Sequence, residues 1–305
     1  MEQTINITPS RISVWIRVSR YFSYTATLVP VLLGAAFAFR YHSVANEWIL
    51  FPISLVCAIL LHAGSNLISE YEDYKHQVDR NDTFGGSGVL VEGLIEPRKI
   101  YWAGVISLIV SVALGMILVY ERGMSVLYLG LVGVFGAYFY TFLKYHAFGD
   151  LEIFLMFGPM MAIGNYFVIT GGFEWNVVFA SIPVGFLVTA ILHANNTRDI
   201  KHDTESKIKT FASLIGLRAS VADYFFLLIG SYISVIIFVA LGIVSYPALL
   251  VLITVPITIK NLQIMRTADL EKPENIMMLD VQTAQLHLLF GLLYCVGIVV
   301  SLWLH

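Results

Sequence analysis

Long apolar runs, each close to the thickness of a membrane, constrain this chain more than any other feature. A helix needs about 20 apolar residues to cross a bilayer core, where it satisfies its own backbone hydrogen bonds. Charged residues make up only 13% of the sequence, against about 25% in an average soluble domain. The runs therefore predict an all-α integral membrane protein with nine transmembrane helices, at about 21–39, 47–69, 100–119, 124–142, 150–171, 177–197, 220–243, 245–264 and 283–304.

We expect the whole chain, 1–305, to form a single transmembrane domain. Cys57 and Cys295 both lie inside apolar runs, which favours buried free thiols over a disulfide or a metal site. The N-terminal residues lack the short apolar core and small-residue cleavage site of a signal peptide, so the first helix is expected to stay as an anchor. The net charge of −3 indicates no nucleic-acid partner, and the apolar surface implies contact with membrane lipid.

The distribution of basic residues predicts how the helices are oriented. Of the 18 Lys and Arg residues, all but Arg40 and Arg122 fall on the side of the membrane that holds the N-terminus. Cytoplasmic loops carry the excess of Lys and Arg. We therefore expect a cytoplasmic N-terminus and, after nine helices, a C-terminus on the outside.

An acidic stretch, residues 66–82, ends the second apolar run and forms the first acidic cluster. On a helix, at about 100° per residue, Asn66, Glu70 and Asp73 fall within an arc of roughly 60°. Carboxylates at the mouth of a membrane span are costly unless a cation meets them. The stretch also contains further acids: Glu72, Asp79 and Asp82.

The second acidic cluster, residues 195–203, ends the sixth apolar run. On a continuous helix Asn195, Asn196, Asp199 and Asp203 would share an arc of about 100°. The predicted topology places both clusters on the cytoplasmic side, where they can face each other. Their separation by four helices is consistent with duplication of a four-helix unit.

Oxygen ligands on two facing helix ends suit Mg²⁺, which usually completes its coordination with water and substrate phosphates. Nearby basic residues can bind a diphosphate beside the metal: Lys75, Arg198, Lys207 and Lys209. The pattern indicates a phosphorylated amphiphile with its tail among the helices. Ionisation of its C–O bond gives an allylic cation, which aromatic faces stabilise. Lys207 and Lys209 have an alternative interpretation as topology signals alone.

Two other features have simpler interpretations. The glycine-rich loop from Gly85 to Gly93 matches neither a P-loop nor a dinucleotide-binding fingerprint, and we interpret it as a flexible loop over the pocket. His193 lies at the edge of the polar face of the sixth helix, and we interpret it as a packed or solvated histidine rather than a base.

The two clusters resemble those of the UbiA superfamily of intramembrane prenyltransferases, and within it the 1,4-dihydroxy-2-naphthoate prenyltransferases of menaquinone synthesis. That branch shows a pattern like Asn-x-x-Asn-Asp-Tyr-x-Asp-Tyr-Lys-x-x-x-Asp, which here begins at Asn66 and ends at Asp79. Further matches are Gly85–Gly93, Gly149-Asp150-Leu151, Phe157-Gly158-Pro159 and the stretch from Asn195 to Asp203.

The resemblance implies nine helices around a central cavity and a Mg²⁺-dependent transfer of a polyprenyl group from its diphosphate. It assigns the metal and diphosphate ligands to Asn66, Glu70, Asp73, Asp79, Asp199 and Asp203. It places Asn195, Asn196 and Arg198 in the same pocket, and Tyr140 and Lys144 match the family's Tyr-x-x-x-Lys element, with Lys144 on the diphosphate. Three departures are Glu70 for the usual Asp, Ser69 for Asn, and Ser206–Thr210 for Gly-Lys-Arg-Thr.

By the same resemblance the aromatic acceptor is 1,4-dihydroxy-2-naphthoate, prenylated with loss of its carboxylate to give demethylmenaquinone. Candidate acceptor residues are Tyr138, Tyr140, Asn165 and Tyr166, with Arg198 as a donor to the carboxylate. Other acceptors, 4-hydroxybenzoate or a glyceryl phosphate, are the first alternative. A cation-coupled transporter is the second, although transporters usually bind near the membrane midplane. We expect a multi-pass protein of the bacterial cytoplasmic membrane with its active site facing the cytoplasm.

Overall fold

The computed structural model describes residues 10–41, 48–80 and 86–303. Within these residues nine helical spans are long and apolar enough to cross a membrane, which confirms the predicted all-α integral membrane fold. Asp82 of the first acidic cluster and Gly85 of the glycine-rich loop lie outside the described residues. Five spans are single helices: α3 (Leu50–Lys75), α4 (Pro97–Arg122), α5 (Met124–Tyr145), α8 (Trp175–Arg198) and α11 (Leu217–Ala240).

The other four spans combine shorter pieces. They are η1 (Tyr21–Tyr24) with α2 (Thr25–Tyr41); α6 (Gly149–Leu155), η3 (Met156–Met160) and α7 (Met161–Thr170); η4 (Tyr246–Thr254) with α12 (Val255–Met265); and η5 (Pro273–Ile276), α13 (Leu279–Val300) and η6 (Ser301–Trp303). Three short helices lie between or before the spans: α1 (Arg11–Val18), α9 (Ile200–Glu205) and α10 (Phe211–Ile215).

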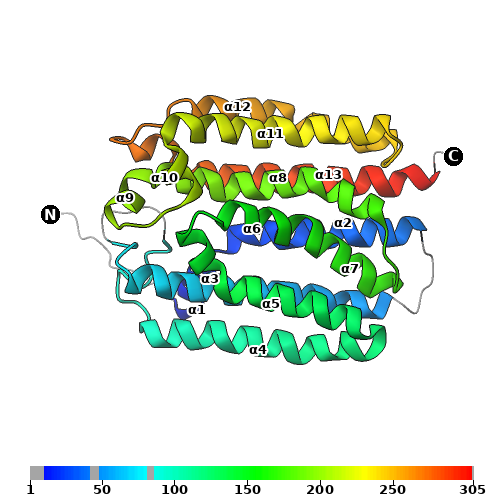
Figure 1. The fold of residues 1–305 in the computed structure, drawn as a ribbon, viewed down its shortest axis with the longest axis horizontal. Helices are drawn as coiled ribbons and strands as arrows, with labels where there is room; N and C mark the ends of the chain where they lie inside the picture. The colour runs from blue at the N-terminus through cyan, green and yellow to red at the C-terminus, as the bar shows by residue number, and fades with distance from the viewer. Residues whose placement is uncertain (1–9, 42–47, 81–85, 304–305) are drawn as a thin grey trace.

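The spans run side by side along the long axis of the molecule (Figure 1). Helices α1, α9 and α10 gather at one end, and the last turn of α13 lies at the other. The described chain therefore starts at one end of the bundle and finishes at the other, as nine crossings require.

Helix α8 is the central helix of the bundle. In its most apolar window 72% of the residues are buried, against 17% for α5. The continuous apolar core joins α8 to α2, α7, α11 and α13. Helices α3, α4 and α5 lie outside this core, and their inner faces leave room for a cavity.

Glycines allow close helix contacts that fix the position of α3. A Cβ on Gly64 of α3 would lie 3.0 Å from the carbonyl oxygen of Gly104 on α4, and a Cβ on Gly104 would lie equally close to the carbonyl oxygen of Gly64. Small residues let membrane helices approach closely and pack tightly. The end of α3, which holds the first acidic cluster, is therefore supported by a rigid pair of helices.

The two acidic clusters differ in backbone structure. Helix α3 continues to Lys75, so Asn66, Glu70 and Asp73 lie on one helix, as predicted. The single helical arc predicted for the second cluster is wrong for Asp203. The chain leaves helical geometry at Asp199 (φ −94°, ψ 7°), and Asp203 lies on the separate helix α9.

Candidate active site

Residues of both acidic clusters line one small pocket, which we call the polar pocket. One wall is formed by the end of α3 and the residues after it, and the other by the end of α8 and by α9. The side chains that line it are Asp73, Val78, Asp79, Lys144, Asn195, Asn196, Asp199, His202 and Asp203. The structure thus brings together two segments far apart in the sequence.

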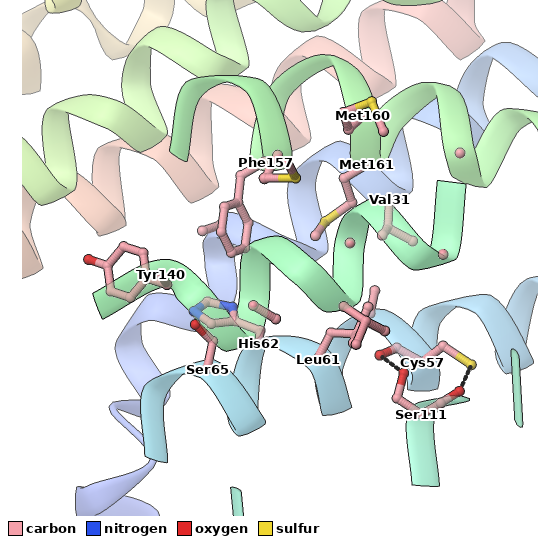
Figure 2. Close-up of a pocket in the computed structure, with 18 of the residues that line it drawn as sticks. Val31, Cys57, Leu61, His62, Ser65, Ser111, Tyr140, Phe157, Met160 and Met161 are labelled. Atoms are coloured by element: carbon pink, nitrogen blue, oxygen red, sulfur yellow. Dashed lines mark hydrogen bonds between the residues drawn. The ribbon is translucent and has the colours of Figure 1, made fainter. Parts of the chain in front are cut away.

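A second, larger space of about 370 Å³ lies among the spans, and we call it the apolar cavity. Its lining is mostly aliphatic, aromatic and methionine side chains, and Figure 2 shows Tyr140, His62 and Phe157 grouped along one part of its wall. Lys144 and Asn195 line both spaces. The two spaces are therefore adjacent, with mostly apolar side chains around one and charged and amide side chains around the other.

In the first cluster, Asp73 is held by groups from another helix. The hydroxyl of Tyr145 donates to its Oδ1 at 2.6 Å, and Lys144 Nζ lies 3.4 Å from its Oδ2. Arg20 Nη2 is 3.9 Å from the same Oδ2. This fully buried carboxylate is thus ion-paired within the protein, which offsets the cost of burying its charge.

Glu70 contacts the glycine-rich loop rather than the polar pocket. Its carboxylate accepts from the backbone N–H of Ser87 at 3.2 Å and from the Ser87 hydroxyl, and it pairs with Arg20 at 3.1 Å. Gly86 lies directly against Asp79, where a Cβ would come 2.1 Å from Asp79 Oδ2. The described part of the loop therefore packs onto the first cluster, and a side chain at residue 86 would displace the Asp79 carboxylate.

Two carboxylates of the polar pocket are in an environment that disfavours their charge. Burial raises the pKa of Asp79 to about 7, and the nearby charges of Asp73 and Glu70 act in the same direction. Burial likewise raises the pKa of Asp203 to about 7. Asp203 accepts from the hydroxyl of Thr210 at 3.0 Å, and Asp79 Oδ2 has no hydrogen-bond partner among the described residues.

In the second cluster, Arg198 is fully engaged by neighbouring groups. Its guanidinium donates to both carboxylate oxygens of Asp199 at 2.8 Å and to Asn195 Oδ1 at 2.5 Å. It also donates to the carbonyl of Met277 at 3.1 Å and lies 3.6 Å from Asp280. Arg198 lines neither space, so the structure gives it the role of bracing Asn195 and Asp199.

Several predicted substrate residues lie away from both spaces. Lys207 and Lys209 are exposed at the surface near α9. Lys75 is also exposed and pairs with Glu72 at 3.3 Å. Tyr138 is 43% exposed on the outer face of α5. The structure therefore does not bring these four residues into the site.

Other predicted residues line the apolar cavity at different depths. Tyr140 lies near its polar end, and Asn66 lines the same region while donating to the carbonyl of Ser19 at 3.1 Å. Asn165 lines the cavity but accepts from Ser54 at 2.6 Å, and Ser54 precedes Asp73 on α3 by roughly 28 Å. Asn165 is thus at the far end, and Tyr166 is buried in the apolar core.

Sequence reasoning missed three groups at the site. Arg20 joins the first cluster from before η1, and it was counted only as a topology signal. Tyr145 was overlooked beside the recognised Lys144. Glu152 lines the apolar cavity, and its Oε2 is buried without a partner among the described residues. An acid inside an apolar run is itself a sign of function, and that sign was present in the sequence.

A membrane-buried cavity that opens onto two facing acidic helix ends is the arrangement of an intramembrane prenyltransferase, and the comparisons with known proteins agree. The chain belongs to the UbiA prenyltransferase family, whose family model matches residues 27–289. This membership confirms the predicted enzyme class over the transporter alternative.

Two relatives illustrate the match along the chain. UbiA prenyltransferase domain-containing protein 1 of Mus musculus is 32% identical over 289 residues, which cover 92% of this chain and 82% of the relative. The 1,4-dihydroxy-2-naphthoate octaprenyltransferase of Bacillus subtilis (strain 168) is 29% identical over 290 residues, which cover 93% and 92% of the two chains.

Solved structures show the same fold. An apo structure of a UbiA homologue from Aeropyrum pernix K1 has a TM-score of 0.66 and 14% identity, covering 92% of this chain and 98% of its own. A UbiA homologue from Archaeoglobus fulgidus, bound to GPP and Mg²⁺, has a TM-score of 0.61 and 15% identity, covering 94% and 99%.

Proposed function

We propose that this prenyltransferase transfers a polyprenyl group from its diphosphate to 1,4-dihydroxy-2-naphthoate, with Mg²⁺, and that the product is the quinol form of demethylmenaquinone. The observation that supports this most directly is the junction of the polar pocket with the apolar cavity at Lys144 and Asn195. The match to the Bacillus subtilis naphthoate octaprenyltransferase over nearly the whole chain supports the choice of acceptor.

The residues of the polar pocket fit Mg²⁺. Its side-chain donors include four carboxylates and two amides, which are the hard oxygen ligands that Mg²⁺ prefers. Asp79 Oδ2 and Asn196 Oδ1 are buried there without a partner among the described residues, although buried polar atoms are normally satisfied. We propose that Asp73, Asp79, Asn196, Asp199 and Asp203 hold the metal. The Archaeoglobus fulgidus homologue bound to GPP and Mg²⁺ supports this assignment.

Each part of the site then has a role in transfer. Bound Mg²⁺ would neutralise the diphosphate as it leaves. Lys144 and Arg20 are the cationic side chains that line the apolar cavity in the described part of the chain, and we propose that they bind the diphosphate. Tyr140, His62 and Phe157 line the region beyond them, where aromatic faces stabilise the allylic cation and apolar walls exclude water.

We propose that the acceptor lies between Lys144 and the aromatic group, with the ring carbon that bears the carboxylate facing the allylic carbon. Attack by that carbon followed by loss of CO₂ restores the aromatic ring. Tyr138 and Asn165 lie too far from this junction to contact the acceptor. Arg198 is held by Asp199 and is therefore not proposed as the donor to the acceptor carboxylate. Glu152, which lines the same cavity, is positioned to accept a hydrogen bond from an acceptor hydroxyl.

An assay with purified enzyme tests the proposal. Long polyprenyl diphosphate and Mg²⁺ are incubated with 1,4-dihydroxy-2-naphthoate, with 4-hydroxybenzoate or with a glyceryl phosphate, and the products are identified by mass. We expect turnover of the naphthoate, with CO₂ released in equal amount. Robust prenylation of 4-hydroxybenzoate without turnover of the naphthoate would contradict the acceptor and leave only the family activity.

We further propose that the chain is a single transmembrane domain of the bacterial cytoplasmic membrane with its polar pocket facing the cytoplasm. The bias of basic residues toward that end supports this orientation. A reporter inserted near Gly86 should mark the cytoplasm and one fused after His305 the outside. Reporters that mark the same side would rule out the proposed topology.

A further inference from the structure

Behind the second acidic cluster lies a buried ionic group that the proposed mechanism does not use. Asp150 is in the first turn of α6, His193 is on α8 and Asp223 is on α11. His193 Nδ1 lies 2.6 Å from Asp150 Oδ2 and 3.7 Å from Asp223 Oδ2. His193 is completely buried, and Asp150 is 7% exposed. Three spans thus meet at one histidine.

Polar groups contact both ring nitrogens of His193. Its Nε2 lies 3.0 Å from the backbone carbonyl oxygen of Ser220, which can only accept. Its Nδ1 faces a carboxylate, which also only accepts. Both ring nitrogens of His193 therefore face polar groups, and the ring lies between the carboxylates of Asp150 and Asp223.

The other oxygen of Asp150 fixes the orientation of Asn196. Asn196 Nδ2 donates to Asp150 Oδ1 at 3.2 Å. Because a carboxylate cannot donate, the amide nitrogen of Asn196 must be the atom that faces Asp150. Its oxygen is left on the opposite side, buried among the residues of the polar pocket and unpartnered within the described chain.

We propose that Asp150 is a positioning residue that, held by His193, orients the Asn196 amide so that its oxygen faces the polar pocket. The orientation decides which ligand Asn196 can serve. An amide oxygen binds a divalent cation or its coordinated water, whereas an amide NH₂ would bind phosphate oxygen. Asn196 is therefore committed to the cation. This inference rests on the proposed metal site, and it assigns Asp150 a role outside the pocket itself.

A double-mutant cycle tests the coupling. Asn196→Ala should raise the half-saturating Mg²⁺ concentration for turnover about tenfold, and Asp150→Ala should raise it by a similar factor. The half-saturating Mg²⁺ concentration of the double variant should be no higher than that of either single variant, because both changes take the same Asn196 oxygen away from the cation. The Michaelis constant for prenyl diphosphate at saturating Mg²⁺ should change less than about threefold, since Asn196 serves the cation and not the phosphate.

Two further variants separate positioning from general damage. Asp150→Asn should recover most of the lost Mg²⁺ affinity, because its amide oxygen still accepts from Asn196 while its NH₂ donates to Nδ1 of a neutral His193, whose Nε2 still donates to the Ser220 carbonyl. Asp223→Asn removes the other carboxylate beside His193 without touching Asn196, and it should leave the Mg²⁺ dependence at the wild-type value. If Asp150→Ala does not fold, Asp150→Ser replaces it, because a serine hydroxyl is too short to reach Asn196.

Binding is also measured without turnover, as the rise in unfolding temperature caused by Mg²⁺ alone. We expect that rise to shrink in Asp150→Ala and Asn196→Ala and to persist in Asp223→Asn. Additive effects in the double variant, or an unchanged Mg²⁺ requirement in Asp150→Ala, would overturn the inference. A wild-type enzyme that turns over fully in chelator would instead overturn the proposed metal site.

Discussion

The two acidic clusters have similar residue patterns but different surroundings. In the first cluster, Glu70 and Asp73 are paired with Arg20, Lys144 and Tyr145, which come from other parts of the chain. In the second cluster, Asp199 is paired with its own neighbour Arg198, and Asp203 has only the hydroxyl of Thr210. The first cluster thus gathers the cations that we propose bind the diphosphate, and the second keeps more oxygen atoms free for the proposed metal. Similar motifs do not have equal roles here.

The largest effects should come from removing one carboxylate on each side. Asp73→Asn and Asp203→Asn should each lower turnover by at least about 100-fold, because a metal ligand contributes several kcal/mol to the transition state. The two variants should differ in folding stability, with Asp73→Asn the less stable. Asp73→Asn leaves Lys144 buried and uncompensated, which costs about 3 kcal/mol or more.

Asp203→Asn should keep or raise the stability of the metal-free protein at pH 8, because burial already disfavours the ionised form of Asp203. Thermal unfolding in detergent with chelator measures both variants. Equal destabilisation of the two variants would show that the two clusters have equivalent surroundings.

The next effect is on the pH dependence of Mg²⁺ binding. In the metal-free protein Asp79 and Asp203, with pKa values of about 7, hold protons that an unfolded chain loses near pH 4. Their contribution to stability therefore falls as pH rises between these values. Mg²⁺ must displace the protons, so its affinity should rise about tenfold between pH 6 and pH 8 for each carboxylate that must ionise.

Calorimetric titration with Mg²⁺ at several pH values measures this effect, and Asp203→Asn is the matched control that should weaken the pH dependence. An Mg²⁺ affinity that stays constant from pH 6 to pH 8 would mean that neither carboxylate binds the metal.

A smaller effect is expected at Glu70, which anchors the glycine-rich loop. Glu70→Gln should lower turnover about tenfold, since an amide NH₂ would face Arg20 where a carboxylate now accepts. Glu70→Asp keeps the charge and should retain substantial activity. Steady-state kinetics of the two variants measures this effect. Equal turnover by the wild type, Glu70→Asp and Glu70→Gln would show that the charge of Glu70 does not contribute to catalysis.

The smallest effects should come from the surface lysines. Lys207→Ala and Lys209→Ala should change kcat/KM by less than about threefold, because exposed cations attract an anionic substrate only weakly in salt. The change should disappear at high ionic strength. A loss above tenfold that persists in salt would place these lysines on the diphosphate, as the sequence pattern suggested.

The sequence predicted the spans because hydropathy reports directly on the solvent around a helix. The predicted facing of the two clusters brought Asp73 and Asp199 to one pocket correctly, and Asp203 lines that pocket from the separate helix α9 rather than from the predicted arc. Spacing could not reveal Arg20. Its own backbone is left-handed (φ 52°) just before η1, and its side chain reaches the first cluster from there. Nor could spacing show that Arg198 is held by Asp199 and Asp280, or that Asn165 lies at the far end of the cavity. Such assignments depend on tertiary packing, which side-chain periodicity does not encode.

The apolar cavity has a consequence for the length of the prenyl chain. Met116 on α4 and Leu131 on α5 line it, and they are 51% and 57% exposed. The cavity therefore opens sideways, toward the acyl chains of the bilayer. Its 370 Å³ lies at the lower end of the about 300–1,000 Å³ typical of small-molecule sites, so a long polyprenyl tail must extend beyond it. We expect the lipid bilayer to solvate the distal tail, and the chain length of the product to be determined by whichever synthase supplies the diphosphate.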